Sequence, residues 1–307
     1  MSIRRGNIAA FAGDSMGKKR GKIKLDKRFQ IGDFCFRLKC SDEVIPPPNF
    51  MLFEAGENQE YMYTYEIVVT DILPEPQGRL TAKRQDLKVY ETETGEERFI
   101  GIKGKEGFYA CYRETGDNRA EVWLAKDRIE GLHIDPVFTS LLALERHMIQ
   151  RNQIVLHCAY MEYQEKAILF SAPSETGKTT QANLWEKYRG SRTVNGDRSL
   201  LGKIDGTWMA QGWPVCGTSE VCHNENIPVH AIVMLSQAKE NQVRKISGRE
   251  AFMLLYSQIT VNRWNREAST LTMDLLMDLL NQVPVYHLGC TISEEAVKCL
   301  EQALEIN

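Results

Sequence analysis

Short apolar runs separated by turn sequences make up the chain between residues 29 and 135. The runs are rich in aromatic and β-branched residues, a composition typical of strands. Proline and glycine stand between them, as in Pro46-Pro47-Pro48 and Glu93-Thr94-Gly95, and supply the backbone angles that turns need. The pattern predicts a β-rich, mostly antiparallel N-terminal domain over residues 29–135, with strands at residues 34–38, 61–69, 87–90, 99–102, 108–112 and 121–124.

A helix is expected next, because Phe138, Leu141, Leu144 and Met148 recur at intervals of three and four residues. Asp135-Pro136 suits the cap and first turn of this helix. From residue 152 onward, apolar runs alternate with helical stretches, which favours an α/β sheet layer in a second domain at residues 136–307. Strands are expected at residues 154–161, 167–170, 231–235 and 285–288; helices are expected at residues 178–188, after the capping-box sequence Ser247-Gly248-Arg249-Glu250, at residues 271–280 and from Ser293.

Charge and cysteine usage narrow the class of protein. The 307 residues include 38 Lys and Arg and 41 Asp and Glu, a formal net charge of −3, with no block of like charge after the first 30 residues. We therefore do not expect electrostatic binding of nucleic acid. The eight cysteines are irregularly spaced and are expected to be reduced. No stretch reads as a signal peptide or a membrane span, so a cytoplasmic protein without membrane contact is expected.

The strongest motif runs from Ala172 to Thr179, between the predicted strand 167–170 and the amphipathic stretch 181–188. In this order of strand, loop and helix, successive backbone N–H groups and the helix dipole can hold polyphosphate. Lys178 is expected to reach the β- and γ-phosphates of ATP, the Thr179 hydroxyl to bind Mg²⁺, and Gly177 to let the backbone approach. The predicted nucleotide-binding residues are Ala172, Pro173, Ser174, Glu175, Thr176, Gly177, Lys178, Thr179 and Thr180.

Two alternatives stand beside this interpretation. The loop could be an ordinary polar turn that happens to contain Gly-Lys-Thr, since Ala172 replaces the usual first glycine. Residues 12–19 have the same spacing, but Lys19 stands where a hydroxyl must bind the metal. These residues belong to a stretch at residues 1–28 that is rich in Gly, Lys and Arg and is expected to be a mobile leader or a loosely held first strand.

Asp197 and His157 are the candidate catalytic residues. Asp197 comes 19 residues after Lys178, at the predicted end of the strand that follows the loop helix. A carboxylate there can accept the proton of an attacking hydroxyl or bind Mg²⁺, and Arg198 can neutralise phosphate charge. Asn195-Gly196-Asp197 could equally be a simple turn. His157, in the apolar strand 154–161, could be a packed core residue unless a carboxylate lies beside it.

Together these residues resemble the catalytic half of HPr kinase/phosphorylase, in the phosphoenolpyruvate-carboxykinase-like branch of phosphate-loop proteins. The resemblance covers about residues 150–304 and rests on His157, on the loop whose Lys178 follows 21 residues later, and on Asp197. It implies that Asp197 acts as the base, that His157 orients or tunes it, and that Lys178 and Thr179 hold nucleotide and metal. Asn195-Gly196-Asp197 offers one carboxylate where that family has an acidic pair. The related enzymes often assemble, so a homo-oligomer is a further expectation.

Other residues are weaker candidates. Glu220, after a Gly- and Pro-punctuated segment at residues 212–219, could be a second metal ligand, and an ordinary hairpin is as good an interpretation. Arg263, beside Trp264, could contact an acceptor or a phosphate, although a surface helix end is the simpler interpretation. Cys216, Cys222 and His223 fit structural zinc poorly, since a fourth ligand is missing.

The sequence thus predicts an α/β fold, α+β overall, in which a nucleotide-binding domain like that of phosphoenolpyruvate carboxykinase and HPr kinase follows a β-rich domain. The predicted activity is an ATP- and Mg²⁺-dependent kinase acting on a hydroxyl acceptor, either a small molecule or a Ser/Thr side chain of a peptide or protein. The alternative is a nucleotide-binding regulatory or scaffolding module with little or no ATPase activity.

Overall fold

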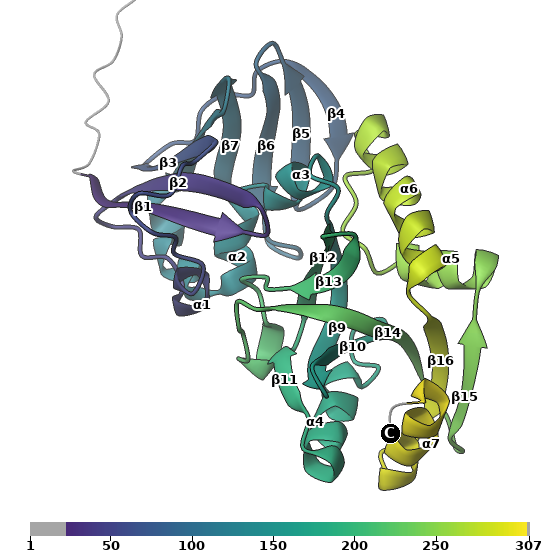
Figure 1. Cartoon of the computed structure of the whole chain (residues 1–307). Helices are drawn as coiled ribbons and strands as arrows, with labels where there is room; N and C mark the ends of the chain where they lie inside the picture. Colours follow the sequence, from purple (N-terminus) through teal and green to yellow (C-terminus); the bar gives the residue numbers. More distant parts are fainter. Residues whose placement is uncertain (1–22, 306–307) are drawn as a thin grey trace, which may run out of the picture.

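The computed structural model describes residues 23–305, and it has a mixed α/β fold with two eight-stranded sheets (Figure 1). The mixed class agrees with the prediction. The motif at residues 12–19 and the rest of residues 1–22 lie outside the described part of the chain. Strand β1 spans Ile23–Ile31, so residues 23–28 belong to the first sheet and not to a leader.

The first sheet has the strand order β1-β2-β3-β8-β7-β6-β5-β4. Its neighbours are antiparallel except for the pairs β2–β3 and β3–β8, which are parallel. The six predicted strands are present; β1 was expected only as a loosely held first strand, and the edge strand β4 was not predicted. The bounds are β2 Phe34–Ser41, β3 Tyr63–Thr70, β4 Arg79–Lys83, β5 Leu87–Thr92, β6 Gly95–Gly101, β7 Phe108–Gly116 and β8 Arg119–Ala125.

Short helices complete the core of this sheet. They are α1 (Pro48–Met51), the 3-10 helix η1 (Lys126–His133), α2 (Asp135–Ser140) and α3 (Leu144–Ile149). Phe50 of α1 contacts both Phe29 and Phe138, with ring centroids 4.9 Å apart in each pair. The domain boundary at residue 136 stays a prediction, but α2 and α3, which follow it, pack into the core of the first sheet.

The predicted single helix through residues 138–148 is wrong. Ala143 adopts a left-handed conformation with φ 46°, which ends α2 and starts α3 in a new direction. Leu141, Leu142, Ala143 and Leu144 are all fully buried. Four consecutive residues of a straight helix point to nearly every side of its axis, so one face could not bury them all. Asp135 does not cap α2 with its side chain; it accepts a hydrogen bond from Asn49 Nδ2 at 2.8 Å.

The second sheet contains three adjacent parallel strands, β10, β14 and β16, and further antiparallel strands around them. The pairings β10–β9, β9–β12, β12–β13, β13–β14 and β14–β10 close a ring, because the long strand β14 leaves β13 and continues beside β10. The bounds are β9 Ile154–Tyr163, β10 Lys166–Ser171, β11 Arg192–Asn195, β12 Arg198–Ile204, β13 Thr207–Gln211, β14 Asn226–Gln237, β15 Gln242–Ile246 and β16 Val285–Cys290.

Helices cover both faces of the parallel strands (Figure 1). Helices α5 (Gly248–Tyr256) and α6 (Arg266–Gln282) pack on the face that carries Leu169 and Ile232. Helices α4 (Lys178–Arg189) and α7 (Glu294–Leu304) pack on the face that carries their neighbours in sequence, such as Phe170 and Val233. Successive strand residues point to opposite faces, so the near-continuous apolar runs of these strands are explained by burial on both sides.

The observed helix caps differ in part from the prediction, which named no cap for α6. Asn265 and Ser293 cap α6 and α7 by accepting hydrogen bonds from the N–H groups of Ala268 and Ala296. The predicted capping box at Ser247 is wrong, because that side chain accepts no cap hydrogen bond. Glu250 is instead paired with Arg244 on the neighbouring strand β15. The Glu250 carboxylate that a capping box would use is thus engaged in an ion pair with Arg244.

A buried charged cluster joins the two sheets. Arg98 of β6 is 4% exposed and forms ion pairs with Glu96 and with Glu145 of α3. Trp264, in the segment before α6, donates its Nε1–H to Glu96 at 3.1 Å and places its ring 5.3 Å from the Arg98 guanidinium. Because removing one member would leave an uncompensated buried charge, this cluster holds the start of α6 against the first sheet.

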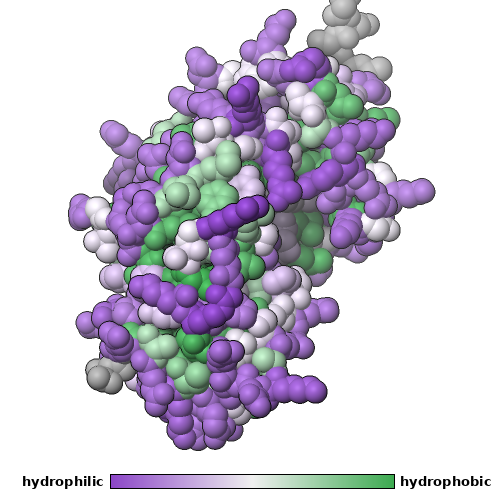
Figure 2. All heavy atoms as spheres, turned by 90° about the vertical axis from the view of Figure 1, so that its right-hand side faces the viewer, coloured by the Kyte–Doolittle hydropathy of each residue, from purple (hydrophilic) through white to green (hydrophobic). Residues whose placement is uncertain are grey.

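The face that carries α5 and α6 exposes large apolar side chains. Met253 of α5 and Met273 and Met277 of α6 are exposed. Figure 2, which views the molecule from the right-hand side of Figure 1, shows green residues gathered among purple ones. A single chain does not test the expected oligomer, which stays a prediction.

No helix within residues 23–305 combines the length and the apolar character that crossing a membrane requires.

His147 of α3 makes folding sensitive to pH. Its ring stacks on Phe34 at 4.6 Å and lies 4.4 Å from the Tyr63 ring. Burial lowers the pKa of His147 to about 4. In the unfolded chain His147 is protonated below about pH 6.5, whereas in the folded chain it stays neutral down to about pH 4. The contribution of His147 to the free energy of unfolding is therefore fully present above pH 6.5 and is lost as the pH falls below it.

We expect His147 to lower the free energy of unfolding by about 2 kcal/mol between pH 7 and pH 5. His147→Phe, which keeps a stacking ring, should remove this dependence, while the exposed His133→Gln should retain it. Urea denaturation at the two pH values measures both. A slope in His147→Phe equal to that of the wild type would contradict the assignment.

Candidate active site

Strand β9 is the element at which the candidate residues meet. It pairs with β10 from Cys158 to Tyr163, with β12 from Ile154 to His157, and with β11 from Tyr160 to Glu162. Leu156 also forms a bridge with Ile259, from the segment after α5. Four chain segments therefore end or turn beside His157 and Cys158.

The loop of residues 172–177 lies between β10 and α4, at the carboxyl end of the parallel strands. Its backbone takes two left-handed conformations, φ 64° at Glu175 and φ 113° at Gly177. Residues of that kind turn backbone N–H groups inward, and the free N–H groups at the start of the 12-residue helix α4 follow directly. Gln181 of α4 donates to the carbonyl of Thr291 at 3.2 Å, which fixes the helix against the end of β16.

Lys178 is a buried cation without a carboxylate in hydrogen-bond contact among residues 23–305. Its Nζ donates to the carbonyl oxygens of Ala172 at 3.1 Å and of Pro173 at 3.4 Å. Burial lowers the pKa of Lys178, and the nearby charge of Asp197 acts in the opposite direction. An anion bound in the loop would therefore compensate a charge that the protein leaves only partly satisfied.

Asp197 lies in the turn between β11, which ends at Asn195, and β12, which begins at Arg198. Its Oδ1 is 3.4 Å from His157 Nε2, and its Oδ2 is 3.1 Å from Arg198 Nε. Burial would raise the pKa of Asp197, but the hydrogen bond from His157 and the charges of Arg198 and Lys178 outweigh burial and lower it. The carboxylate is therefore ionised at neutral pH, and His157 has the acidic partner that its functional interpretation required.

Asn195 builds the turn that holds Asp197. The Asn195 side chain is fully buried; its Oδ1 accepts the N–H groups of Asp197 and Arg198, both at 2.9 Å, and its Nδ2 donates to the carbonyl of Trp213 at 3.0 Å. The backbone of Gly217, with φ 61°, packs so closely that an added Cβ would lie 3.1 Å from Asp197 Cβ. Asn195-Gly196-Asp197 is thus a turn, and that turn presents the carboxylate to His157.

The weaker candidates lie outside this cluster. Glu220 and Arg263 are exposed, and within residues 23–305 no hydrogen bond or ion pair joins either side chain to Lys178 or Asp197. Trp264, next to Arg263, packs against the first sheet. The segment at residues 212–219 does reach the site, since it packs against Asp197, but Trp213 and Cys216 are buried in the core of the first sheet.

Sequence reasoning missed two functional candidates, Gln258 and Thr260. His157 Nδ1 lies 3.2 Å from Gln258 Oε1, and the His157 N–H donates to the Gln258 carbonyl at 2.9 Å. Arg198 Nη1 donates to Thr260 Oγ1 at 3.2 Å. Gln258 is 101 positions from His157 in the chain, and Thr260 is 62 positions from Arg198. The pairing of Leu156 with Ile259 brings both residues to β9. No local pattern marks them, because a single bridge brings them to β9.

A model of the SynChlorMet cassette protein ScmC family matches residues 124–305. The chain belongs to this family. The matched region contains every candidate residue discussed above. The Hpr(Ser) kinase/phosphatase from Coxiella burnetii is a similar solved structure, with 11% identity over 50% of this chain and 99% of that chain and a TM-score of 0.31. Among curated proteins, none matches the sequence.

The candidate metal ligands, Thr179 and Asp197, both offer oxygen atoms. Within residues 23–305, no group of three or more His, Cys, Asp and Glu side chains is arranged to hold a metal. Cys216, Cys222 and His223 therefore do not form a metal site. Mg²⁺ needs no such group, since it is usually held by one or two protein oxygens together with substrate phosphates. The partly exposed hydroxyl of Thr179 and the Asp197 carboxylate are hard oxygen donors of the kind that Mg²⁺ prefers.

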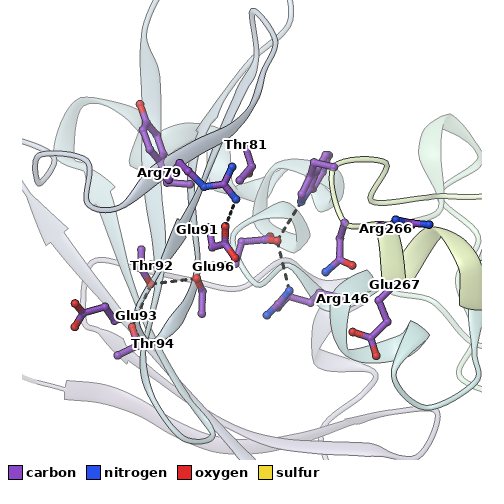
Figure 3. Close-up of a pocket in the computed structure, with 14 residues that line it drawn as sticks. Arg79, Thr81, Glu91, Thr92, Glu93, Thr94, Glu96, Arg146, Arg266 and Glu267 are labelled. Carbon is purple, nitrogen blue, oxygen red and sulfur yellow. Dashed lines mark hydrogen bonds and ion pairs between the residues drawn. The ribbon is translucent and has the colours of Figure 1, made fainter.

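A separate cleft of about 670 Å³ lies between the first sheet and the start of α6 (Figure 3). It contains none of the predicted nucleotide-binding residues. Its charges are largely paired with one another: Arg79 with Glu91, and Arg146 with Glu96, which also accepts the Trp264 N–H. The cleft is therefore bounded by the charged cluster that joins the two sheets.

We expect Asn195→Asp to destabilise the fold, because a buried carboxylate would face the Trp213 carbonyl in place of an N–H donor. The free energy of unfolding should fall by about 1 to 3 kcal/mol, the cost of a buried polar group left without its partner. Urea denaturation measures the change, with the exposed Asn224→Asp as the matched control. Equal stability of Asn195→Asp and the wild type would show that the amide is not needed.

Proposed function

We propose that this chain is an ATP- and Mg²⁺-dependent kinase that transfers the γ-phosphoryl group to a hydroxyl acceptor, either a small molecule or a Ser/Thr side chain of a peptide or protein. The observation that carries the proposal is the contact of Asp197 Oδ1 with His157 Nε2 at 3.4 Å, close enough to Lys178 for the two charges to affect each other. The carboxylate follows β11, the histidine lies within β9, and the lysine is at the start of α4.

The loop supports nucleotide binding through its backbone and its cation. The left-handed residues Glu175 and Gly177 and the start of α4 supply N–H groups, and the α4 dipole adds partial positive charge. Lys178 would move from the Ala172 and Pro173 carbonyls to the phosphates of bound ATP. That exchange replaces neutral partners with an anion, which favours binding because the amine is buried.

Asp197 is assigned the role of base. The acceptor hydroxyl would donate a hydrogen bond to the carboxylate, which takes its proton as the oxygen attacks the γ-phosphorus and ADP leaves. Arg198, held by Thr260, and Lys178 would stabilise the negative charge of the transferred group. When bound to Thr179 and Asp197, Mg²⁺ would neutralise phosphate charge at this place.

The alternative is a nucleotide-binding regulatory or scaffolding module with weak or no ATPase activity. Such a module needs the loop but has no use for a base. The pairing of His157 with Asp197, and the turn that Asn195 builds for this purpose, favour the enzyme.

Transfer of label from γ-labelled ATP tests the proposal. Purified protein is incubated with labelled ATP, Mg²⁺ and a cell extract fractionated by size; label in a defined acceptor supports the kinase. Lys178→Ala should lose both ATP binding and transfer, whereas Lys187→Ala, an exposed change in the same helix, should lose neither. Free phosphate or no product from the wild type would favour the module.

Asp197→Asn should separate binding from chemistry. The amide keeps the shape of the side chain but removes the base, so transfer should fall by about 10²- to 10⁴-fold while calorimetry still detects ATP binding. The exposed Asp274→Asn is the matched control and should transfer at the wild-type rate. Wild-type transfer by Asp197→Asn would rule out the base.

Thr179 should matter through its hydroxyl alone. Thr179→Ser keeps the oxygen and should stay active, whereas Thr179→Val, of nearly the same shape, should lose the Mg²⁺ dependence of ATP binding. Calorimetry of ATP with and without Mg²⁺ measures the difference. If the valine variant kept the wild-type Mg²⁺ dependence, Thr179 would not be a ligand.

A further inference from the structure

We propose that Ile292 is the platform on which the base of the bound nucleotide rests, so that the nucleoside extends from the loop at residues 172–177 toward the turn between β16 and α7. This role rests on the proposed binding of ATP, because it concerns the nucleoside of the same ligand. It gives a function to a side chain that no motif in the sequence marks.

The order of the strands sets the direction in which a bound nucleotide runs. Strand β10, which leads into the loop, lies between β9 on one side and β14 and β16 on the other. His157 and Asp197 lie on the β9 side. For transfer the γ-phosphate has to face Asp197, so the nucleoside, at the other end of the triphosphate, leads away from β9 and toward β14 and β16.

The ends of β14 and β16 form a wall on that side of the loop. Both strands continue beyond the end of β10, to Gln237 and Cys290. The turn after β16 leads directly into α7, whose N-cap is Ser293. Arg189 of α4 pairs with Glu301 of α7 at 2.6 Å, and both helices cover the same face of the sheet. The two helices therefore begin beside each other, at the edge of the sheet where the loop lies.

Hydrogen bonds hold the turn after β16 in place. Asn241 Oδ1 accepts the Thr291 N–H at 2.8 Å, and the Thr291 carbonyl accepts Gln181 Nε2 at 3.2 Å. Gln181 belongs to the first turn of α4, which begins with Lys178. Ile292, the next residue after Thr291, is thus carried on fixed backbone close to the N–H groups that are proposed to hold phosphate.

The Ile292 side chain is 78% exposed, although its neighbours in the chain are fixed. An apolar residue just before an N-cap often packs against the fourth residue of the helix, here Val297. Val297 is fully buried, and Ile292 does not join the core that contains it. Its exposure excludes a contact of that kind. A fixed apolar side chain open to solvent suits the flat face of a base, which gains by leaving water.

The first turn of α7 favours the nucleoside over phosphate at this position. Glu294 and Glu295 follow the cap, and their charges oppose an anion at the start of the helix. The first turn of α4, from Lys178 to Gln181, contains no acidic residue. The charged and uncharged parts of ATP are thereby directed to different helix ends, the triphosphate to α4 and the base to Ile292.

Contact with the face of a base does not distinguish one base from another, because every base has an apolar face and differs from the others at its edge. Ile292 should therefore support the binding of ATP and of GTP to the same extent.

Methyl NMR tests the contact directly. Full-length protein labelled with ¹³C in the isoleucine δ1-methyl groups is titrated with ATP or with inorganic tripolyphosphate, each with Mg²⁺. The Ile292 signal is assigned as the one missing from Ile292→Val. A base on this side chain should shift the signal upfield through its ring current, and tripolyphosphate should not. The signal of Ile72, which is 82% exposed and follows β3, is the control and should stay unchanged.

Calorimetry measures the contribution to affinity. Ile292→Ser removes the apolar platform and should weaken the binding of ATP and GTP by about five- to tenfold, as expected for partial burial of one aliphatic side chain. Its binding of tripolyphosphate should equal that of the wild type. Ile72→Ser should bind all three ligands as the wild type does.

Three results would overturn the proposal. They are an Ile292 signal that bound ATP leaves in place or that tripolyphosphate moves equally, an ATP affinity of Ile292→Ser equal to that of the wild type, and an equal loss of affinity for ATP and tripolyphosphate, which would place the effect on the loop. Failure of the wild type to bind either ATP or tripolyphosphate would instead defeat nucleotide binding by the loop, and the role of Ile292 with it.

Discussion

Pairing on both edges of β9 is the constraint on which the candidate site depends. Along one strand, β9 meets β10, β11, β12 and the segment at residues 258–260. His157 alternates with Leu156 and Cys158, which are buried in the core beneath α5 and α6. A shift of one residue in register would turn His157 into that core and away from Asp197. The backbone secures the register next to the site, since Cys158 donates its N–H to the Asp197 carbonyl and Ser171 donates its hydroxyl to the His157 carbonyl.

The second feature of the site is the handling of buried charge. Desolvation of Lys178 and of Asp197 is costly, yet the two do not form a direct ion pair, and each is stabilised by other groups. Lys178 has two neutral carbonyls, and Asp197 has Arg198 and His157. A tight pair between Lys178 and Asp197 would have satisfied both charges and left neither for a substrate. In the proposed kinase, keeping them apart would leave a cation for phosphate and a carboxylate for a hydroxyl.

Sequence patterns predicted the elements that have local causes. The predicted helices and strands after residue 152 are present, because their apolar residues follow the period of the element. Asp197 was predicted at the end of the strand that follows the loop helix, and this strand is β11. The break at Ala143 could not be predicted, since it follows from a demand to bury four consecutive residues. Glu250 was assigned to a capping box because its competitor, Arg244, lies on a different element. Gln258 and Thr260 were missed because a pairing between distant segments brings them to the site.

Asn195 bears on what a site with one carboxylate can do. Its Oδ1 is used within the turn and its Nδ2 donates to the Trp213 carbonyl, so the amide is not free to bind a metal or a substrate. In the proposed kinase, Asp197 would then be the single catalytic carboxylate, and each of its oxygens already has a partner. The charges around it lower its pKa and so weaken it as a base. A weak base suffices for phosphoryl transfer, because the transition state is loose and the hydroxyl gives up its proton late. The single carboxylate and the charges that lower its pKa are therefore compatible with the proposed phosphoryl transfer.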